Sequence, residues 1–243
     1  DMDAIKKWNN DYLKKKFKKN IFDVQCFKNI TDSETTNLYK VEKINFEEYL
    51  NVINKIEPHY YLAGRELEMY KNNISNDIFD DLKMKIDDYR KPVQHMLFIG
   101  NNSKSGCHLH CDWDYAINQI FGEKTVYLFD YYDNIDLKIH SINHHQYNFI
   151  TKNFFRLNHK LYKIYKVTLV PGNTLLIPPW WYHAVENNGY SCSVTKTFHR
   201  SHYYLFKKPM LLYIYIILNK SWLFPIIIIL FILIFILFKL KNK

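Results

Sequence analysis

Hydrophobic and polar positions change their period near residue 93. Before that point, apolar residues recur at helical spacing, and this pattern predicts helical stretches at residues 5–19, 46–56 and 65 to about 88. Two shorter runs predict strands at residues 22–27 and 59–63. Residues 1–92 are therefore expected to form a helical and strand-containing support for the segment that follows.

From residue 93 the chain consists of eight short runs rich in β-branched and aromatic residues. The runs are MLFIG, HLHCDW, AINQIFG, EKTVYLF, YKVTLV, TLLIP, WYHAVE and YSCSVTKTF. Gly, Pro-Gly and Asn-Asn-Gly segments separate most of them, and a polar insert lies at 140–158. This spacing is typical of an antiparallel sandwich or barrel, so residues 93–200 are expected to form the β core.

A third pattern begins near the C-terminus. Trp222–Phe238 reads WLFPIIIILFILIFILF, 17 positions without a charge, or about 25 Å as a helix. A buried core helix is the alternative, but an all-round apolar helix followed by lysines is more often a membrane span. We predict a transmembrane helix at 221–239, preceded by a juxtamembrane segment at 201–220.

Two orientations of this anchor are open. No apolar signal-peptide region precedes the domain, which favours a single-pass C-terminal anchor with the domain in the cytosol. The last five residues, KLKNK, resemble a retrieval signal of the endoplasmic reticulum, so that membrane is the second possibility. The chain starts without a methionine, which leaves open whether more residues precede it.

Composition and charge narrow the protein class. In 243 residues, 48% are hydrophobic, and six Gly, seven Pro and four Cys exclude collagen-like and disulfide-built small proteins. The net charge of +9 permits contact with nucleic acid or an anionic surface without establishing it. Because Trp8, Leu13 and Phe17 interleave with the lysines of residues 6–19, that stretch is expected to be the solvated face of a docked helix. We expect no nucleic-acid partner.

The candidate chemistry lies in the run Gly-Cys-His-Leu-His-Cys-Asp. Strand alternation places His108, His110 and Asp112 on one face and the cysteines on the other. His110 and Asp112 can hold one metal ion, and His183, after Pro-Pro-Trp-Trp-Tyr, can supply a third ligand. Two His and one carboxylate form the facial triad of non-haem Fe(II) oxygenases. His108 is either a neighbour that supports the ligands or a hydrogen-bonded polar residue without a role.

A specific resemblance rests on two segments. LFIGNNSKSGCHLHCDWDYAINQIFGEKTVYLFD and VTLVPGNTLLIPPWWYHAVEN resemble the JmjC and cupin-like Fe(II)- and 2-oxoglutarate-dependent oxygenases, particularly the hypoxia-inducible-factor asparaginyl hydroxylase branch. The family order of H-x-D, Q-x-x-G-x-K and a later P-G-D-x-L-x-I-P-x-x-W-x-H matches over about residues 8–200. The resemblance implies a mainly β double-stranded β-helix (jelly-roll) with flanking helices, Fe(II) as cofactor and 2-oxoglutarate as cosubstrate.

The resemblance also implies roles for individual residues. His110, Asp112 and His183 would be the catalytic metal ligands. Lys124 would pair with the distal carboxylate of 2-oxoglutarate, and Tyr61 would hydrogen-bond the same carboxylate.

Three positions depart from the family pattern. Family members usually have a residue with a hydroxyl group three positions before the first ligand His, and this chain has Cys107 at that position. The loop from Asp112 to Gln119 is one residue shorter than in the family. Thr195, which we include among the cosubstrate-binding residues, stands where the hydroxylase branch has an asparagine.

The sequence thus predicts a membrane-anchored 2-oxoglutarate-dependent dioxygenase that hydroxylates a protein side chain and releases succinate and CO2. The alternative is a catalytically inactive or differently reacting cupin-like metal-binding module tethered to a membrane. A chromatin-associated demethylase is disfavoured by the C-terminal apolar segment. The substrate, the hydroxylated atom and the oligomeric state are not determined by these patterns.

Overall fold

Strands dominate the computed structural model. It describes residues 2–18, 20–34, 39–70, 74, 76–110, 113–130, 133–134, 139–144, 147–150 and 153–199. The helices are α1 (Ala4–Lys7), α2 (Asn10–Phe17), α3 (Phe46–Val52), α4 (Asp77–Asp81) and α5 (Lys85–Tyr89). Short 3-10 helices are η1 (Ile30–Glu34), η2 (Leu67–Tyr70), η3 (Phe154–Arg156) and η4 (His159–Leu161). The strands are β1 (Ile21–Phe27), β2 (Tyr39–Asn45), β3 (His59–Glu66), β4 (Gln94–Asn101), β5 (Lys104–His110), β6 (Trp113–Asp130), β7 (Ile139–His144), β8 (Tyr147–Ile150), β9 (Tyr165–Leu169), β10 (Thr174–Ile177) and β11 (Trp181–His199).

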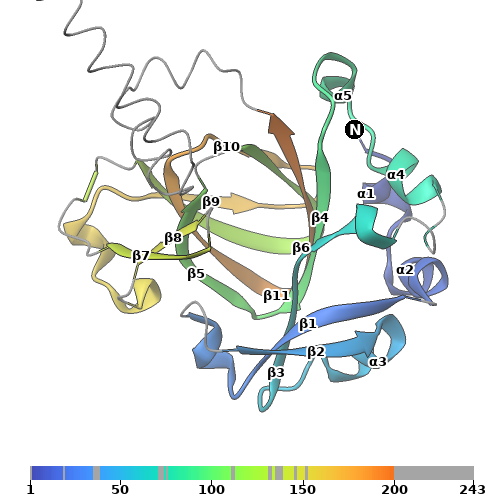
Figure 1. Cartoon of the computed structure of the whole chain (residues 1–243), viewed down its shortest axis with the longest axis horizontal. Coiled ribbons are helices and arrows are strands. Elements are labelled where there is room, and N and C mark those ends of the chain that lie inside the picture. The colour runs from blue at the N-terminus through green and yellow to red at the C-terminus, as the bar shows by residue number, and fades with distance from the viewer. Residues whose placement is uncertain are drawn as a thin grey trace, which may run out of the picture.

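The strands pair into one antiparallel sheet that bends around a central space (Figure 1). The order is β2-β1-β3-β4-β11-β5-β8-β7, and β6 pairs with β9, β10 and β11. In Figure 1, β1, β2 and β3 lie beneath this curved part, while α1, α2 and α4 lie along one side. The prediction of a mainly β antiparallel domain with few helices is confirmed, and the arrangement is consistent with a cupin-type jelly roll.

Two of the predicted pairs of short strands are continuous. The runs AINQIFG and EKTVYLF form the single strand β6, and WYHAVE and YSCSVTKTF form β11. Gly122 lies inside β6 with a positive φ of 69°, a conformation that glycine adopts without strain, and its lack of a Cβ atom makes room for β11, which passes close by. β6 and β11 pair along most of their lengths, with register shifts between Asn188 and Ser193. Both strands contribute residues to the lining of the cavity described below.

The first 92 residues contain less helix than predicted. The helix expected at 5–19 is split, because Trp8 has extended backbone and Asn9 begins α2 by accepting a hydrogen bond from the Tyr12 amide at 2.9 Å. Of the region expected to contain helical stretches, 65 to about 88, the first residues are strand because β3 runs through Glu66, and the short helices η2, α4 and α5 follow. β2 was not predicted. Its pattern of exposed and half-buried residues lacks the apolar alternation of a buried strand.

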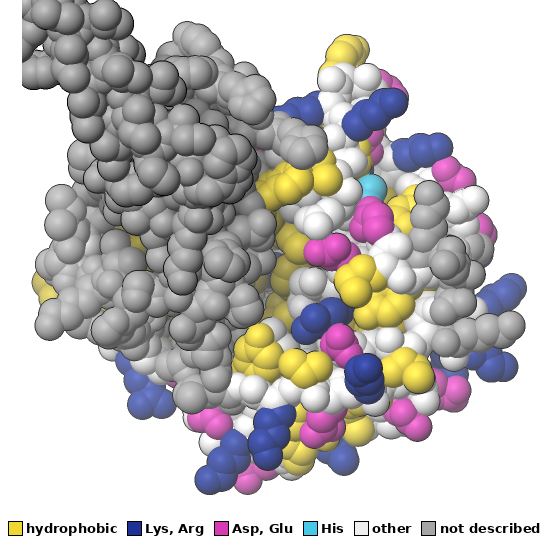
Figure 2. Space-filling model, in the orientation of Figure 1, with side chains coloured by type: hydrophobic (Ala, Val, Ile, Leu, Met, Phe, Trp, Pro, Cys, Tyr) yellow, Lys and Arg dark blue, Asp and Glu magenta, His cyan; other side chains and the backbone are white. Residues whose placement is uncertain are grey.

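The predicted docking of the N-terminal basic stretch is confirmed. Leu13 and Phe17 are fully buried, and Phe17 packs edge-to-face against Phe22 and Phe46. Several lysines of this stretch pair with acidic residues: Lys7 with Asp81, Lys14 with Glu47 and Lys16 with Asp77. On the face drawn in Figure 2, Lys and Arg side chains mix with Asp and Glu side chains. The lysines are thus the polar side of a docked helix.

The predicted membrane helix at 221–239 and the segment at 201–220 lie outside the described residues. Among the residues that are described, no helix has both the length and the apolar character needed to cross a bilayer. The division at residue 92 is bridged by hydrogen bonding, because β3 pairs with β4.

Candidate metal and anion site

Three histidines from two neighbouring strands converge at one place. His108 and His110 lie at the end of β5, and His183 lies near the start of β11, directly opposite His108 in the strand register. The ring centroids are 4.3 Å apart for His108 and His183, 4.9 Å for His108 and His110, and 5.1 Å for His110 and His183. One ring nitrogen of each lies within 4.8 Å of the others. This spacing suits three imidazoles that share one metal ion.

Strand alternation separates the histidines from their neighbours, as predicted. Cys107 and Leu109 point to the other face of β5 and pack in a buried apolar cluster with Trp180 and Tyr182. Burial raises the pKa of the Cys107 thiol well above its ordinary value. Cys107 is therefore a core residue, and the sulfur takes no part in the histidine cluster.

Backbone carbonyls orient two of the rings. His108 Nδ1 donates to the Gly106 carbonyl at 2.8 Å, and His183 Nδ1 faces the Trp181 carbonyl at 3.3 Å. Because a carbonyl only accepts, each neutral ring carries its proton on Nδ1 and its lone pair on Nε2. Hydrogen bonds of this kind hold metal-binding histidines in the ligating tautomer.

Burial keeps all three imidazoles neutral. It lowers the pKa of His110 well below its ordinary value, and the neighbouring His108 and His183 add to this effect. Burial also lowers the pKa of His183 well below its usual value, and the neighbouring His108 adds to this effect. The pKa of His108 is lowered by burial, against the opposing hydrogen bond to Gly106. Neutral imidazole is the form that binds a metal ion.

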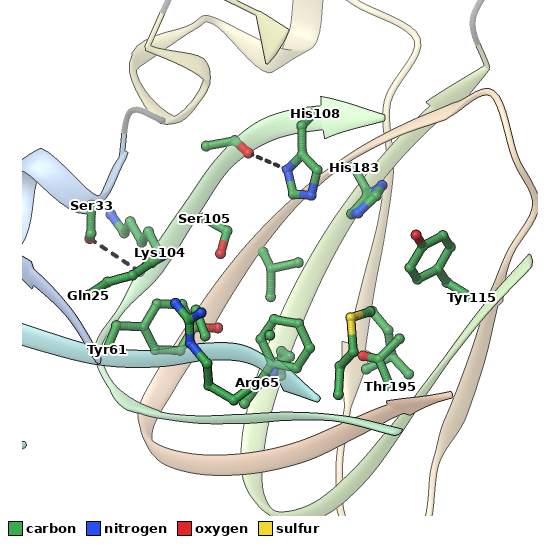
Figure 3. A pocket seen from close by; sticks show the side chains of 18 of the residues that line it. Gln25, Ser33, Tyr61, Arg65, Lys104, Ser105, His108, Tyr115, His183 and Thr195 are labelled. Carbon is green, nitrogen blue, oxygen red and sulfur yellow. Dashed lines mark hydrogen bonds between the residues drawn. The ribbon is translucent and has the colours of Figure 1, made fainter. Parts of the chain in front are cut away.

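The cluster forms part of the wall of a cavity of about 440 Å³ (Figure 3). Lys124 of β6 lines the same cavity and is only 2% exposed. Its ammonium group donates to Ser193 Oγ and lies 5.3 Å from the centre of the Phe98 ring. Burial lowers the pKa of Lys124 to about 8, and no carboxylate of the described residues forms an ion pair with it. An anion that enters the cavity would stabilise the charged amine.

Tyr61 and Ser105 lie on one wall of the cavity (Figure 3). Tyr61 is 1% exposed, and burial raises its pKa to about 12 while hydrogen bonding with Ser105 opposes the rise. The register explains why Ser105 and His108, three positions apart, both reach the cavity. His183 is opposite His108 but Val185 is opposite Ser105, so β5 carries one extra residue there. A bulge of this kind changes which residues face inward.

The structure brings together most of the predicted site residues. His110, His183, Lys124, Tyr61 and Thr195 all line this one cavity. Asp112, the predicted carboxylate ligand, lies outside the described residues. Their roles as metal and cosubstrate ligands stay predictions.

Three cavity residues were missed or undervalued from the sequence. His108 is a full member of the histidine cluster, whereas the sequence predicted only that it supports the ligands or has no role. Ser105 provides a hydroxyl group in the cavity, whereas the sequence comparison aligned the family's hydroxyl position with Cys107. A signal for it existed, because Ser105 precedes His108 by three positions, the family spacing between hydroxyl and first ligand. Arg65 also lines the cavity, and no sequence pattern singled it out.

The aromatic residues before His183 are mainly packing residues. Trp180 and Tyr182 are 2% and 1% exposed and belong to the apolar cluster behind β5. Trp181 packs against a second cluster that contains Tyr115 and Ile177. These rings therefore pack in or against the apolar core.

Comparison with known proteins supports the family resemblance at a coarse level. A family model described as a cupin-like domain matches residues 1–204, which covers the whole described region. No curated protein matches the chain. The match supports the cupin-like, JmjC-type family and does not extend to the asparaginyl hydroxylase branch.

Proposed function

Because the chain belongs to the cupin-like domain family, we propose that it is an Fe(II)- and 2-oxoglutarate-dependent oxygenase that hydroxylates a protein side chain. One observation carries the proposal: a single cavity is lined both by a three-histidine cluster and by a buried lysine that has no acidic partner among the described residues. A metal ion and an anion can therefore bind in the same space.

His108, His110 and His183 would hold the metal. Their nitrogens are close enough to share an ion, their rings are neutral, and two of them are oriented by carbonyls. Imidazole suits iron as well as zinc, copper and nickel, so the preference for iron rests on the family. Asp112, the predicted carboxylate ligand, lies outside the described residues and stays a predicted ligand.

Lys124 would bind the distal carboxylate of 2-oxoglutarate. The hydroxyls of Tyr61, Ser105 and Thr195 lie on the same cavity and can donate to that carboxylate. No Asp or Glu is among the described residues that line the cavity, so nothing there repels an anion.

When bound, iron, 2-oxoglutarate and O2 would supply the oxidation: one oxygen atom of O2 would convert a substrate C–H into C–OH, and the other would enter succinate, which is released with CO2. The chain's own residues would position the metal and the cosubstrate and shield them from water. Apolar side chains of Ile117, Ile177 and Val185 line the cavity and limit access of water. His108 and His183 stay in the ligating tautomer through their carbonyl contacts, and Lys124 holds the cosubstrate's far end.

The test measures binding and turnover separately on the full chain. Anaerobic titrations give the Kd values for Fe(II) and 2-oxoglutarate, and succinate release is then followed in air. We expect His110→Ala to lose iron binding. We expect Lys124→Ala to raise the Kd for 2-oxoglutarate by at least about tenfold and to leave iron binding unchanged. Lys166→Ala, which removes an exposed lysine of β9, is the matched control. A wild-type chain that binds no 2-oxoglutarate would refute the enzyme assignment.

A second candidate function is favoured by the ligand set. Three neutral imidazoles bring no negative charge to a metal, unlike two histidines and a carboxylate. A cupin-like metal-binding module with other chemistry, or with none, would fit this cluster. Iron binding without 2-oxoglutarate binding in the titrations above would select this alternative.

A further inference from the structure

The charge of the cavity exceeds what the proposed cosubstrate needs. Its described lining contains the cationic residues Arg65, Lys104 and Lys124 and no acidic residue. Lys104 is neutralised by Glu34 at 2.9 Å and Glu186 at 3.4 Å. Lys124 is the residue proposed for 2-oxoglutarate. Arg65 forms no ion pair with the described residues, so its charge has no assigned use.

The backbone of β3 directs Arg65 to the cavity. Leu62 pairs with Ile99 but Arg65 pairs with Leu97, so β3 carries one extra residue between them. Gly64 lies in this bulge with a positive φ of 64°. Bulges with a glycine in this conformation re-aim the side chains beside them and are frequent next to active sites.

Arg65 and Tyr61 both line the cavity (Figure 3). Its Nε atom is buried and has no hydrogen-bond partner among the described residues. A buried N–H of a charged group without an acceptor costs free energy, so an acceptor that enters the cavity would bind favourably. The apolar Met96 and Phe98 side chains also line this space and lower the local dielectric constant.

We infer that Arg65 binds a carboxylate of the primary substrate, and therefore that the protein segment hydroxylated at this site contains an acidic side chain. The inference rests on the proposed function. One 2-oxoglutarate molecule would use the metal at one end and Lys124 at the other, which leaves the guanidinium for a second anion. A guanidinium binds a carboxylate through two parallel hydrogen bonds, a geometry that an amide cannot satisfy. The net charge of +9 also favours association with acidic protein segments.

The chain permits a direct test, because it contains only the arginines Arg65, Arg90, Arg156 and Arg200. The full chain is labelled with nitrogen isotope in its arginines, and the Nε signal of Arg65 is assigned by its loss in Arg65→Gln. The protein is loaded with 2-oxoglutarate and a metal that supports no turnover, such as Zn(II). Short glycine peptides with one central glutamate, glutamine or lysine are then titrated.

We expect the glutamate peptide to shift the Arg65 signal and to bind at least about tenfold more tightly than the glutamine peptide. Arg65→Gln should abolish this preference, and Arg65→Lys should keep part of it. Arg156→Gln is the matched control, since Arg156 is 70% exposed and does not line the cavity. It should leave the preference unchanged.

Two results would overturn the inference. Equal binding of the glutamate and glutamine peptides would show that Arg65 does not select an anion. A Kd for 2-oxoglutarate raised at least about tenfold in Arg65→Gln would assign Arg65 to the cosubstrate instead. Failure of the proposed function is recognised separately, as absence of 2-oxoglutarate binding in the wild-type chain; a glutamate-specific shift of the Arg65 signal would still support an acid-binding cavity.

Discussion

Lys124 shows how burial prepares one residue for a ligand. Its amine is 2% exposed, and its pKa of about 8 is below the ordinary value because water no longer solvates the charge. A bound carboxylate would restore part of that stabilisation. The same residue is thus unfavourable to the fold when charged and favourable to an anion complex.

This pKa predicts a pH dependence. Only the protonated amine attracts a carboxylate, and in the unliganded protein Lys124 loses its proton as the pH rises through about 8. The affinity for 2-oxoglutarate should therefore be nearly constant between pH 7 and 8 and then fall by roughly tenfold per pH unit. Calorimetric titration from pH 7 to 9.5 measures this. Lys124→Met should bind 2-oxoglutarate weakly, with an affinity that does not fall as the pH rises. A wild-type affinity independent of pH would contradict the prediction.

The ligand set gives a second residue-scale prediction. In the described cluster His108 stands opposite His183, and one ring nitrogen of each of His108, His110 and His183 lies within 4.8 Å of the others. His108→Ala should therefore weaken Fe(II) binding by at least about a hundredfold, and Asp112→Asn is measured beside it because Asp112 is the predicted carboxylate ligand. Anaerobic metal titration compares the two variants. Loss of iron in Asp112→Asn with retention in His108→Ala would restore the two-histidine and one-carboxylate assignment.

At the scale of elements, pairing between β5, β6 and β11 brings the site together. β11 pairs with β5 at the histidines and with β6 from Trp181 to His199, so it contacts both the histidine cluster and the strand that carries Lys124. The bulge in β5 turns Ser105 inward, and the bulge in β3 precedes Arg65. Irregularities in strands, more than the regular parts, decide which polar groups meet.

Gly122 permits the close passage of β6 and β11. A Cβ atom at this position would lie 2.1 Å from the Tyr190 carbonyl oxygen, and the φ of 69° disfavours other residues. We expect Gly122→Ala to lower the free energy of unfolding by roughly 3 kcal/mol. Gly189 also has a positive φ, but nothing lies within 4 Å of its added Cβ, so Gly189→Ala should cost about 1 kcal/mol. Urea unfolding measures both, and equal losses would show that the close passage is unimportant.

At the scale of the whole molecule, the described domain ends at residue 199, and the apolar segment Trp222–Phe238 follows in the sequence. We propose that this segment anchors the domain in a membrane, so that its substrates are proteins found near that membrane. The hydrophobic length agrees with the thickness of a bilayer's hydrocarbon core, roughly 30 Å.

The anchor can be tested by fractionation of cells that express the full chain. The wild-type protein should stay in the membrane pellet after alkaline carbonate extraction. Ile228→Lys combined with Ile232→Lys should release it, since each lysine near the centre of a span costs about 3 kcal/mol. Ile228→Leu with Ile232→Leu is the matched control and should remain in the pellet. Release of the wild-type chain would exclude a membrane span.

The sequence by itself determined the mainly β fold and that His108 and His110 share one face of their strand. It also marked Lys124 and His183 as candidate site residues, each in its own motif. The fold and the shared face of His108 and His110 follow from side-chain alternation and turn residues, which are local properties, whereas Lys124 was singled out by the family resemblance. It did not reveal that β6 and β11 are continuous, because a glycine inside a strand and a glycine in a turn look alike.

Only the tertiary structure decided which groups share the cavity. The register of β5 against β11 places His108 opposite His183, and the bulges bring in Ser105 and Arg65. Register depends on pairing between strands far apart in the sequence, and a shift by one residue reverses the face of every side chain. Alternation along one strand carries no information about such a shift, so the composition of the site could be established only from the folded chain.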